Sequence, residues 1–145
     1  MRGAPRPYEP HTASAAAALY QPSAMETSPQ DIGLIRVYHA HVYYDPATTR
    51  PDAAAVREQV CARFPVQAGR WHDVPVGPHT QAMYQLVFAP DTFSTLVPWL
   101  MLNRRGLDVL IHPDTGFPRR DHLVHGFWLG RQLPLRGERL PEQED

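Results

Sequence analysis

Residues 37–44 read VYHAHVYY, a run of β-branched and aromatic side chains that contains two histidines. Such residues favour a strand, and in a strand side chains two positions apart point to the same face. His39 and His41 therefore project side by side. The opposite face of the run is apolar or aromatic and consists of Tyr38, Ala40, Val42 and Tyr44. A strand of this kind belongs in the middle of a sheet, so we expect its histidine face to lie over a pocket or a subunit interface.

The other elements alternate around this strand. Hydrophobic periodicity and turn residues predict one helix after Thr49 and a second between Asp91 and Gly106. The predicted strands are 34–44, 66–72, 82–89, 107–112 and a short fifth at 126–129. This order, βαββαβ plus one strand, is that of the split βαβ arrangement. We therefore predict an α+β, ferredoxin-like fold in which two helices cover one face of an antiparallel sheet and leave the histidine face open.

The ends of the chain differ in composition from this central region. Residues 1–32 are rich in Pro, Ala, Ser and Thr without a sustained period, which predicts a disordered leader. Residues 136–145, RGERLPEQED, are polar and charged, which predicts a flexible tail. The predicted folded domain is thus 33–135, a length that suits one hydrophobic core.

Composition narrows the function classes. The formal net charge of −1 gives no reason to expect nucleic acid or a membrane as partner. All 14 basic residues are arginine, which excludes a lysine nucleophile or Schiff base. The single cysteine, Cys61, cannot form an intrachain disulfide, and its place beside Val60 on a predicted helix favours a buried thiol. Because the sequence has no run of about 20 apolar residues, we expect a cytoplasmic protein.

Histidines are concentrated at strand ends and in the loops beside them. Seven of the eight fall in this region, namely His39, His41, His72, His79, His112, His122 and His125. Imidazole is a good ligand for Fe, Zn, Cu and Ni, so the pattern predicts a mononuclear transition-metal site. The spacing matches no zinc finger and there is no CxxC, which argues against structural zinc.

Four stretches that carry these histidines resemble, in order, motifs of the DOPA 4,5-dioxygenase family. They are YHAHVYYDPATT (38–49), FPVQAGRWHDVPVGPH (64–79), PWLMLNRRGLDVLIHPDTG (98–116) and DHLVHGFWLG (121–130). The resemblance covers the predicted domain and implies an extradiol dioxygenase, which opens the ring of a catechol such as DOPA with non-haem Fe(II) and O₂. Zinc is the other metal that such a site could carry on purification.

The resemblance also implies roles for individual histidines. By motif position the family's histidines correspond to His41, His79, His112 and His122 in this chain. We predict His41, His79 and His112 as the metal ligands. The remaining candidates, expected in acid–base chemistry or in support of the ligands, are His122, His125 and His39.

The identity of the third ligand stays open at this point. Many non-haem Fe(II) oxygenases use two histidines and one carboxylate. The sequence offers five carboxylates near the motifs: Asp45, Asp73, Asp108, Asp114 and Asp121.

Two other function classes would also use this fold. One is a metal-free small-molecule-binding or interaction module, in which His39 and His41 lie in a dimer interface. The other is a cofactor-free monooxygenase on a similar dimeric scaffold. Iron content separates both from the dioxygenase, for which we expect a catechol and O₂ as partners, a homodimer, and no nucleic acid or membrane partner.

Overall fold

The structure, a computed structural model, describes residues 28–144. Its strands are β1 (Val37–Tyr44), β2 (Val66–Ala68), β3 (Ala82–Phe88), β4 (Val109–Asp114) and β5 (Phe127–Leu129). Its helices are α2 (Arg50–Arg63), α3 (Phe93–Asn103) and α4 (Pro118–Leu123), with single 3₁₀ turns η2 (Ile32–Leu34), η3 (Pro90–Thr92) and η4 (Gly137–Arg139). The predicted disordered leader, residues 1–32, falls almost entirely outside the described residues. None of the helices in 28–144 combines the length and apolar character needed to cross a membrane.

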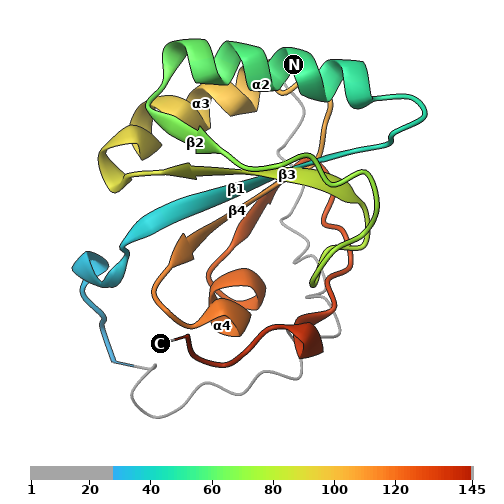
Figure 1. Cartoon of the computed structure of the whole chain (residues 1–145). Coiled ribbons are helices and arrows are strands. Elements are labelled where there is room, and N and C mark those ends of the chain that lie inside the picture. The colour runs from blue at the N-terminus through green and yellow to red at the C-terminus, as the bar shows by residue number, and fades with distance from the viewer. Residues whose placement is uncertain (1–27, 145) are drawn as a thin grey trace, which may run out of the picture.

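The sheet has the strand order β2-β3-β1-β4-β5, and each pair of neighbours is antiparallel. β1 lies between β3 and β4 in the middle of the sheet (Figure 1). This topology confirms the predicted α+β fold with its split βαβ order and added edge strand. The strand predicted at 66–72 is shorter than expected because Gly69, a residue that weakens strands, follows Ala68. His72 then rejoins the sheet as an isolated bridge to Met83.

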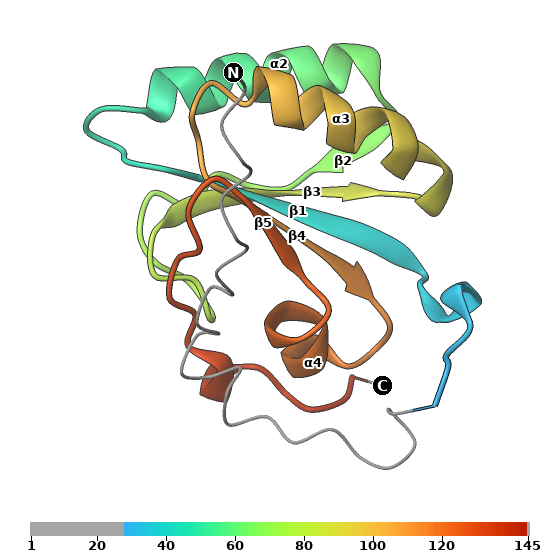
Figure 2. The same ribbon diagram turned by 180° about the vertical axis from the view of Figure 1, so that it is seen from behind.

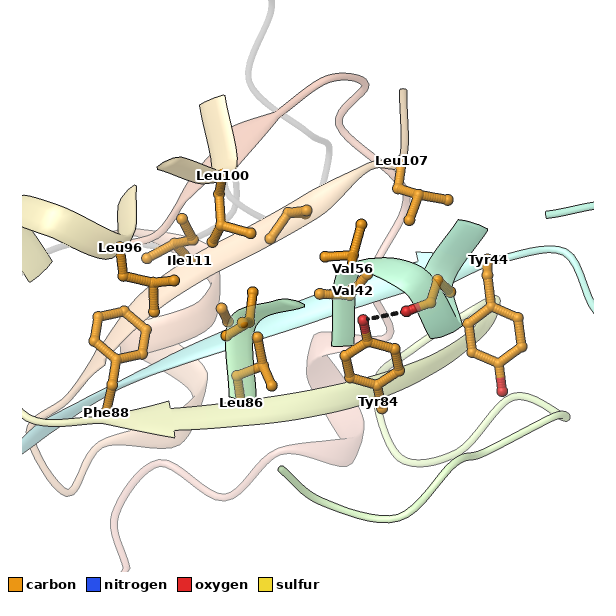
Figure 3. Close-up of a cluster of buried hydrophobic side chains, with 14 of the residues drawn as sticks. Val42, Tyr44, Val56, Tyr84, Leu86, Phe88, Leu96, Leu100, Leu107 and Ile111 are labelled. Carbon is orange, nitrogen blue, oxygen red and sulfur yellow. Dashed lines mark hydrogen bonds between the residues drawn. The ribbon is translucent and has the colours of Figure 1, made fainter. Parts of the chain in front are cut away.

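Both long helices cover the same face of the sheet, as predicted (Figures 1 and 2). The apolar face of β1 lies under them, and its residues Ala40, Val42 and Tyr44 are buried in the main core. Figure 3 shows this core between the helices and the sheet. Tyr84 reaches from β3 toward α2, where its hydroxyl donates to the carbonyl of Ala53 at 2.7 Å. The alternation read from the sequence therefore assigns the two faces of β1 correctly.

The prediction of a buried Cys61 is wrong. α2 buries Ala53, Val56 and Val60 on one stripe. Cys61 follows Val60 and is rotated about 100° around the helix axis, because an α-helix has 3.6 residues per turn. Its side chain therefore leaves the core, and the thiol is exposed.

The second face of the sheet is not open, contrary to expectation. α4 lies on this side, opposite α2 and α3 (Figure 1). A smaller apolar cluster fills part of the space, formed by Tyr43, Met83, Leu110 and Leu133. α4 has six residues, PRRDHL, which are too few and too polar to show an apolar period. Pro118 at its first turn, with a preset φ, is the main local signal for a helix start.

The C-terminal segment contacts the same side of the molecule. The guanidinium of Arg119 donates to the carbonyls of Gly137 (3.3 Å) and Leu140 (2.8 Å), and the flexibility expected of residues 136–145 stays a prediction. The backbone N–H of Glu144 donates to the carbonyl of Gly116 at 2.8 Å. The polar composition on which the prediction rested does not reveal these backbone carbonyls as acceptors for α4. Through these hydrogen bonds the segment contacts α4 and the loop that precedes it.

Candidate metal centre

Five histidines from four parts of the chain gather under the second face of the sheet. They are His39 and His41 on β1, His79 in the loop before β3, His112 on β4 and His122 on α4. The register of β1 and β4 places His39 directly opposite His112. His41, two residues along the same strand, is then the diagonal neighbour of His112. The sheet itself thus brings three of the imidazoles together, and a loop and a helix add the other two.

The rings of these histidines are close to one another. The centroids of His112 and His122 lie 3.8 Å apart, and those of His41 and His79 lie 4.3 Å apart. The Nε2 atoms of His41 and His112 are separated by 3.0 Å. Both of these side chains are only 2% exposed. Such a compact group of buried and half-buried imidazoles is a suitable ligand set for a metal ion.

Two overlapping triads within this group could each hold a metal. One is His39, His41 and His112, and the other is His41, His79 and His122; within each triad, the ligand atoms lie within 4.8 Å of one another. His41 belongs to both. The ligand set predicted from the sequence, His41, His79 and His112, is divided between the two triads and stays a prediction. His72 and His125 belong to neither triad.

Backbone carbonyls fix the tautomer of two of the rings. Nδ1 of His112 lies 2.8 Å from the carbonyl oxygen of Pro113, and Nδ1 of His122 lies 2.6 Å from that of Pro118. A carbonyl can only accept, so in both rings Nδ1 carries the proton and donates it. In the neutral ring, Nε2 then has a free lone pair, which is the form that binds a metal.

Burial keeps these imidazoles neutral. It is the largest cause that lowers the pKa of all five from 6.5, namely His39, His41, His79, His112 and His122. The pKa of His79 falls to about 3. Around His41 the neighbouring imidazoles lower the pKa further, because a second positive charge nearby would repel the first. Burial likewise raises the pKa of Tyr43, so its phenol keeps its proton. At neutral pH the cluster therefore presents uncharged nitrogens.

The geometry of the cluster fits a bound transition metal. Two nitrogens that bind one metal at about 2.1 Å and at a right angle lie about 3.0 Å apart, which is the separation of the His41 and His112 Nε2 atoms. Nδ1 of His41 is buried without a hydrogen-bond partner. An unpartnered buried nitrogen costs free energy in a purely structural cluster and is more typical of functional sites.

The five carboxylates that the sequence left open as a third ligand accept hydrogen bonds elsewhere. Asp45 accepts from the N–H of Ala47, Asp73 from Tyr44 and Arg50, Asp108 from Arg131, Asp114 from Arg36, and Asp121 from Thr115. Within residues 28–144, both candidate triads consist of histidine alone. The geometry therefore favours a site made of imidazoles.

A cavity of about 480 Å³ opens beside His112. Its walls are largely apolar and aromatic, with Tyr38, Phe93 and Phe127 among them. The exposed His125 lines the same cavity. This volume is in the range of small-molecule sites, which are typically apolar with a few polar groups. An aromatic ring can therefore lie next to the histidine cluster.

Gly126 packs tightly against the cluster. A Cβ at this position would lie 3.1 Å from the carbonyl oxygen of His122 and 3.2 Å from the Cβ of His112. Because both neighbours belong to the cluster, Gly126→Ala is expected to displace them and to weaken metal binding, with a loss of about 1–3 kcal/mol in the free energy of unfolding. Urea titration and zinc titration of the variant measure the two effects. Wild-type values in both would show that the backbone accommodates the methyl group.

Sequence reasoning named all five histidines of the cluster but missed three other features. Gly126 and the aromatic cavity walls bear no local pattern that distinguishes them from turn and core residues. For Tyr43, the alternation of the strand predicts its face, but the contact of its hydroxyl with Nδ1 of His79, at 2.7 Å, was not predicted. Tyr43 continues the alternation of His39 and His41 on the same face of β1.

Known proteins resemble this chain over the same region. Residues 38–139 match the Dopa 4,5-dioxygenase family. An uncharacterized 21.2 kDa protein of Botryotinia fuckeliana is 32% identical over 120 residues, which span 75% of this chain and 66% of that protein. The DOPA 4,5-dioxygenase of Amanita muscaria is 30% identical over 119 residues, which span 77% of this chain and 52% of the fungal protein. The chain thus spans between half and two thirds of the length of these curated relatives.

A solved structure extends the comparison to the fold. The crystal structure of a "putative dioxygenase" from Nostoc punctiforme PCC 73102 has 54% sequence identity and a TM-score of 0.74, and the match covers 76% of this chain and 95% of that one. The family match contains β1 through η4 from Tyr38 onward, and with it all five clustered histidines. On these grounds the chain belongs to the Dopa 4,5-dioxygenase family.

Proposed function

We propose that this protein is an extradiol dioxygenase that opens the ring of a catechol such as DOPA, with Fe(II) as its metal and O₂ as co-substrate. Membership of the Dopa 4,5-dioxygenase family supports an oxygenase. The observation that carries the metal-dependent reaction is the approach of the His41 and His112 Nε2 atoms to 3.0 Å in a buried cluster of neutral imidazoles.

His41 and His112 would hold the metal, and a third imidazole of the cluster would complete the set. Fe(II) bound there would supply a centre at which the catechol oxygens and O₂ can both coordinate and exchange electrons. Imidazole suits this metal, and zinc is the other ion that the same ligands would accept. The protein must also orient the catechol ring and accept protons from its hydroxyl groups.

The cavity beside His112 is suited to both tasks. Tyr38, Phe93 and Phe127 offer apolar contacts to an aromatic ring and keep water away from its faces. His125 lines the cavity from an exposed position and is placed to accept a proton from a catechol hydroxyl. Those imidazoles of the cluster that do not bind the metal would support the ligands or take part in later proton transfer. The expected homodimer and cytoplasmic location stay predictions.

Anaerobic loading with Fe(II) tests the proposal. We expect metal-stripped protein to take up about one iron per chain, and to convert DOPA or a simpler catechol to a coloured ring-opened product once air is admitted. With ¹⁸O₂, mass spectrometry should find both oxygen atoms in the product. Zinc-loaded protein is the control and should bind substrate without turnover.

The competing function classes predict different results. Incorporation of a single oxygen atom without any dependence on iron would indicate the cofactor-free monooxygenase. Neither iron uptake nor turnover with any catechol would indicate a metal-free binding module. Either outcome would overturn the proposal.

A further inference from the structure

Tyr43 contacts the histidine cluster through its hydroxyl group, although it is not one of the candidate metal ligands. Its hydroxyl oxygen lies 2.7 Å from Nδ1 of His79. Both side chains are buried, with exposed fractions of 2% for Tyr43 and 4% for His79. Solvent is therefore a poor substitute for either partner, and the direction of this hydrogen bond matters.

The surroundings decide which of the two atoms donates. A phenol has one proton to give, and within residues 28–144 the Tyr43 hydroxyl has no hydrogen-bond partner apart from His79. If Nδ1 of His79 donated, the phenolic proton would be buried without an acceptor. If the phenol donates, both groups are satisfied. The hydroxyl of Tyr43 is therefore the donor and Nδ1 of His79 the acceptor.

This direction sets the tautomer of His79. A neutral imidazole carries a single proton, so when Nδ1 accepts, Nε2 bears the hydrogen. His112 and His122 are the reverse case, because their Nδ1 atoms donate to the carbonyls of Pro113 and Pro118. His79 thus differs from His112 and His122: it carries the N–H on Nε2, whereas those two rings have a lone pair there.

We propose that Tyr43 is a positioning residue that holds His79 with its proton on Nε2, so that His79 acts as a hydrogen-bond donor at the site and not as a metal ligand. This inference rests on the proposed function for its catalytic meaning. It assigns the metal to His39, His41 and His112, the triad that remains complete without His79. It replaces our sequence-based expectation that His79 is a ligand.

Long-range ¹H–¹⁵N correlation spectra of protein labelled with ¹⁵N-histidine test the tautomer directly, at neutral pH and without metal or substrate. We expect a protonated Nε2 for His79 and a protonated Nδ1 for His112 and His122 in the wild type. Tyr43→Phe should shift His79 toward the other tautomer and leave His112 and His122 unchanged. Single histidine substitutions assign the signals.

Tyr84→Phe is the matched control. Tyr84 is also a fully buried tyrosine on the sheet, and its hydroxyl donates to the carbonyl of Ala53 under the helices. Removing this hydroxyl should leave all the histidine signals as in the wild type. A merely structural effect of losing a buried phenol would instead alter both variants alike.

Metal binding and turnover complete the test. Tyr43→Phe and His79→Ala should each keep one zinc or iron per chain and lose at least tenfold in kcat on the catechol. A His79 that is protonated on Nδ1 in the wild type, or a His79→Ala variant that loses its metal, would overturn the proposal. The NMR result does not require an active enzyme, so failure of the tautomer assignment can be told apart from failure of the dioxygenase proposal.

Discussion

Replacing His41 is expected to abolish metal binding and ring cleavage together. His41 is the one histidine that both candidate triads share among the described residues, so its loss leaves no complete triad. Loss of a residue that only supports a ligand lowers metal affinity about 10–100-fold, and removal of a ligand should exceed this range. Metal content per chain, zinc affinity and catechol turnover of His41→Ala measure the effect.

Two further variants control for folding and for non-specific effects. His41→Gln keeps most of the buried volume, so a fold that survives in it separates ligand loss from a cavity in the core. His72→Ala removes a half-buried histidine outside both triads and should keep full metal content. Full iron content and turnover in His41→Gln would show that the metal lies elsewhere.

The metal-free protein is expected to unfold in mild acid, at a higher pH than most small domains do. Five histidines, three of them buried and two half-buried, have pKa values below 6.5 in the folded state. Well above pH 6.5 these groups are neutral in both states and contribute no pH dependence. Below it, the unfolded chain takes up protons that the folded chain refuses until its own lower pKa is reached, which is about 3 for His79. The free energy of unfolding therefore falls as the pH falls.

The free energy of unfolding is expected to change steeply with pH. Each such histidine lowers the free energy of unfolding by about 1.4 kcal/mol per pH unit in this window. Typical domains have about 5–15 kcal/mol in total, so two or three histidines acting together would exhaust the stability by about pH 4. Urea denaturation at a series of pH values gives the slope. In His79→Gln the slope should decrease by about one proton, and a slope near zero in the wild type would contradict the expected burial.

The strands of the sheet could be predicted from the sequence because their side chains alternate between two faces of different character. The alternation in VYHAHVYY distinguishes a helix-covered face from a histidine face, and packing in the core enforces that alternation. α4 was not predicted because a polar helix of six residues has no recognisable hydrophobic period and depends on contacts with the rest of the fold. The same holds for the C-terminal segment, whose hydrogen-bond acceptors are backbone carbonyls that every sequence has.

The sequence predicted which histidines form the cluster, but not the part that each histidine plays in it. Residue type and resemblance single out the histidines, and the register of β1 and β4 explains why His39 meets His112. What separates one imidazole from another is the partner of its second nitrogen: a carbonyl for His112 and His122, a phenol for His79, and none for Nδ1 of His41. These partners arise from backbone paths that no local pattern specifies.

The two faces of β1 have a consequence for how such a protein can diverge. Ala40, Val42 and Tyr44 belong to the core under the helices, while His39, His41 and Tyr43 face the site on the other side. A substitution on the site face can therefore change metal binding with little effect on the core. A substitution on the core face can change stability with little effect on the metal ligands. Insertion or deletion of a single residue in the strand would exchange the two faces and place imidazoles among the aliphatic side chains. A point substitution in this strand therefore affects the core or the site, whereas a change in its length would disturb both at once.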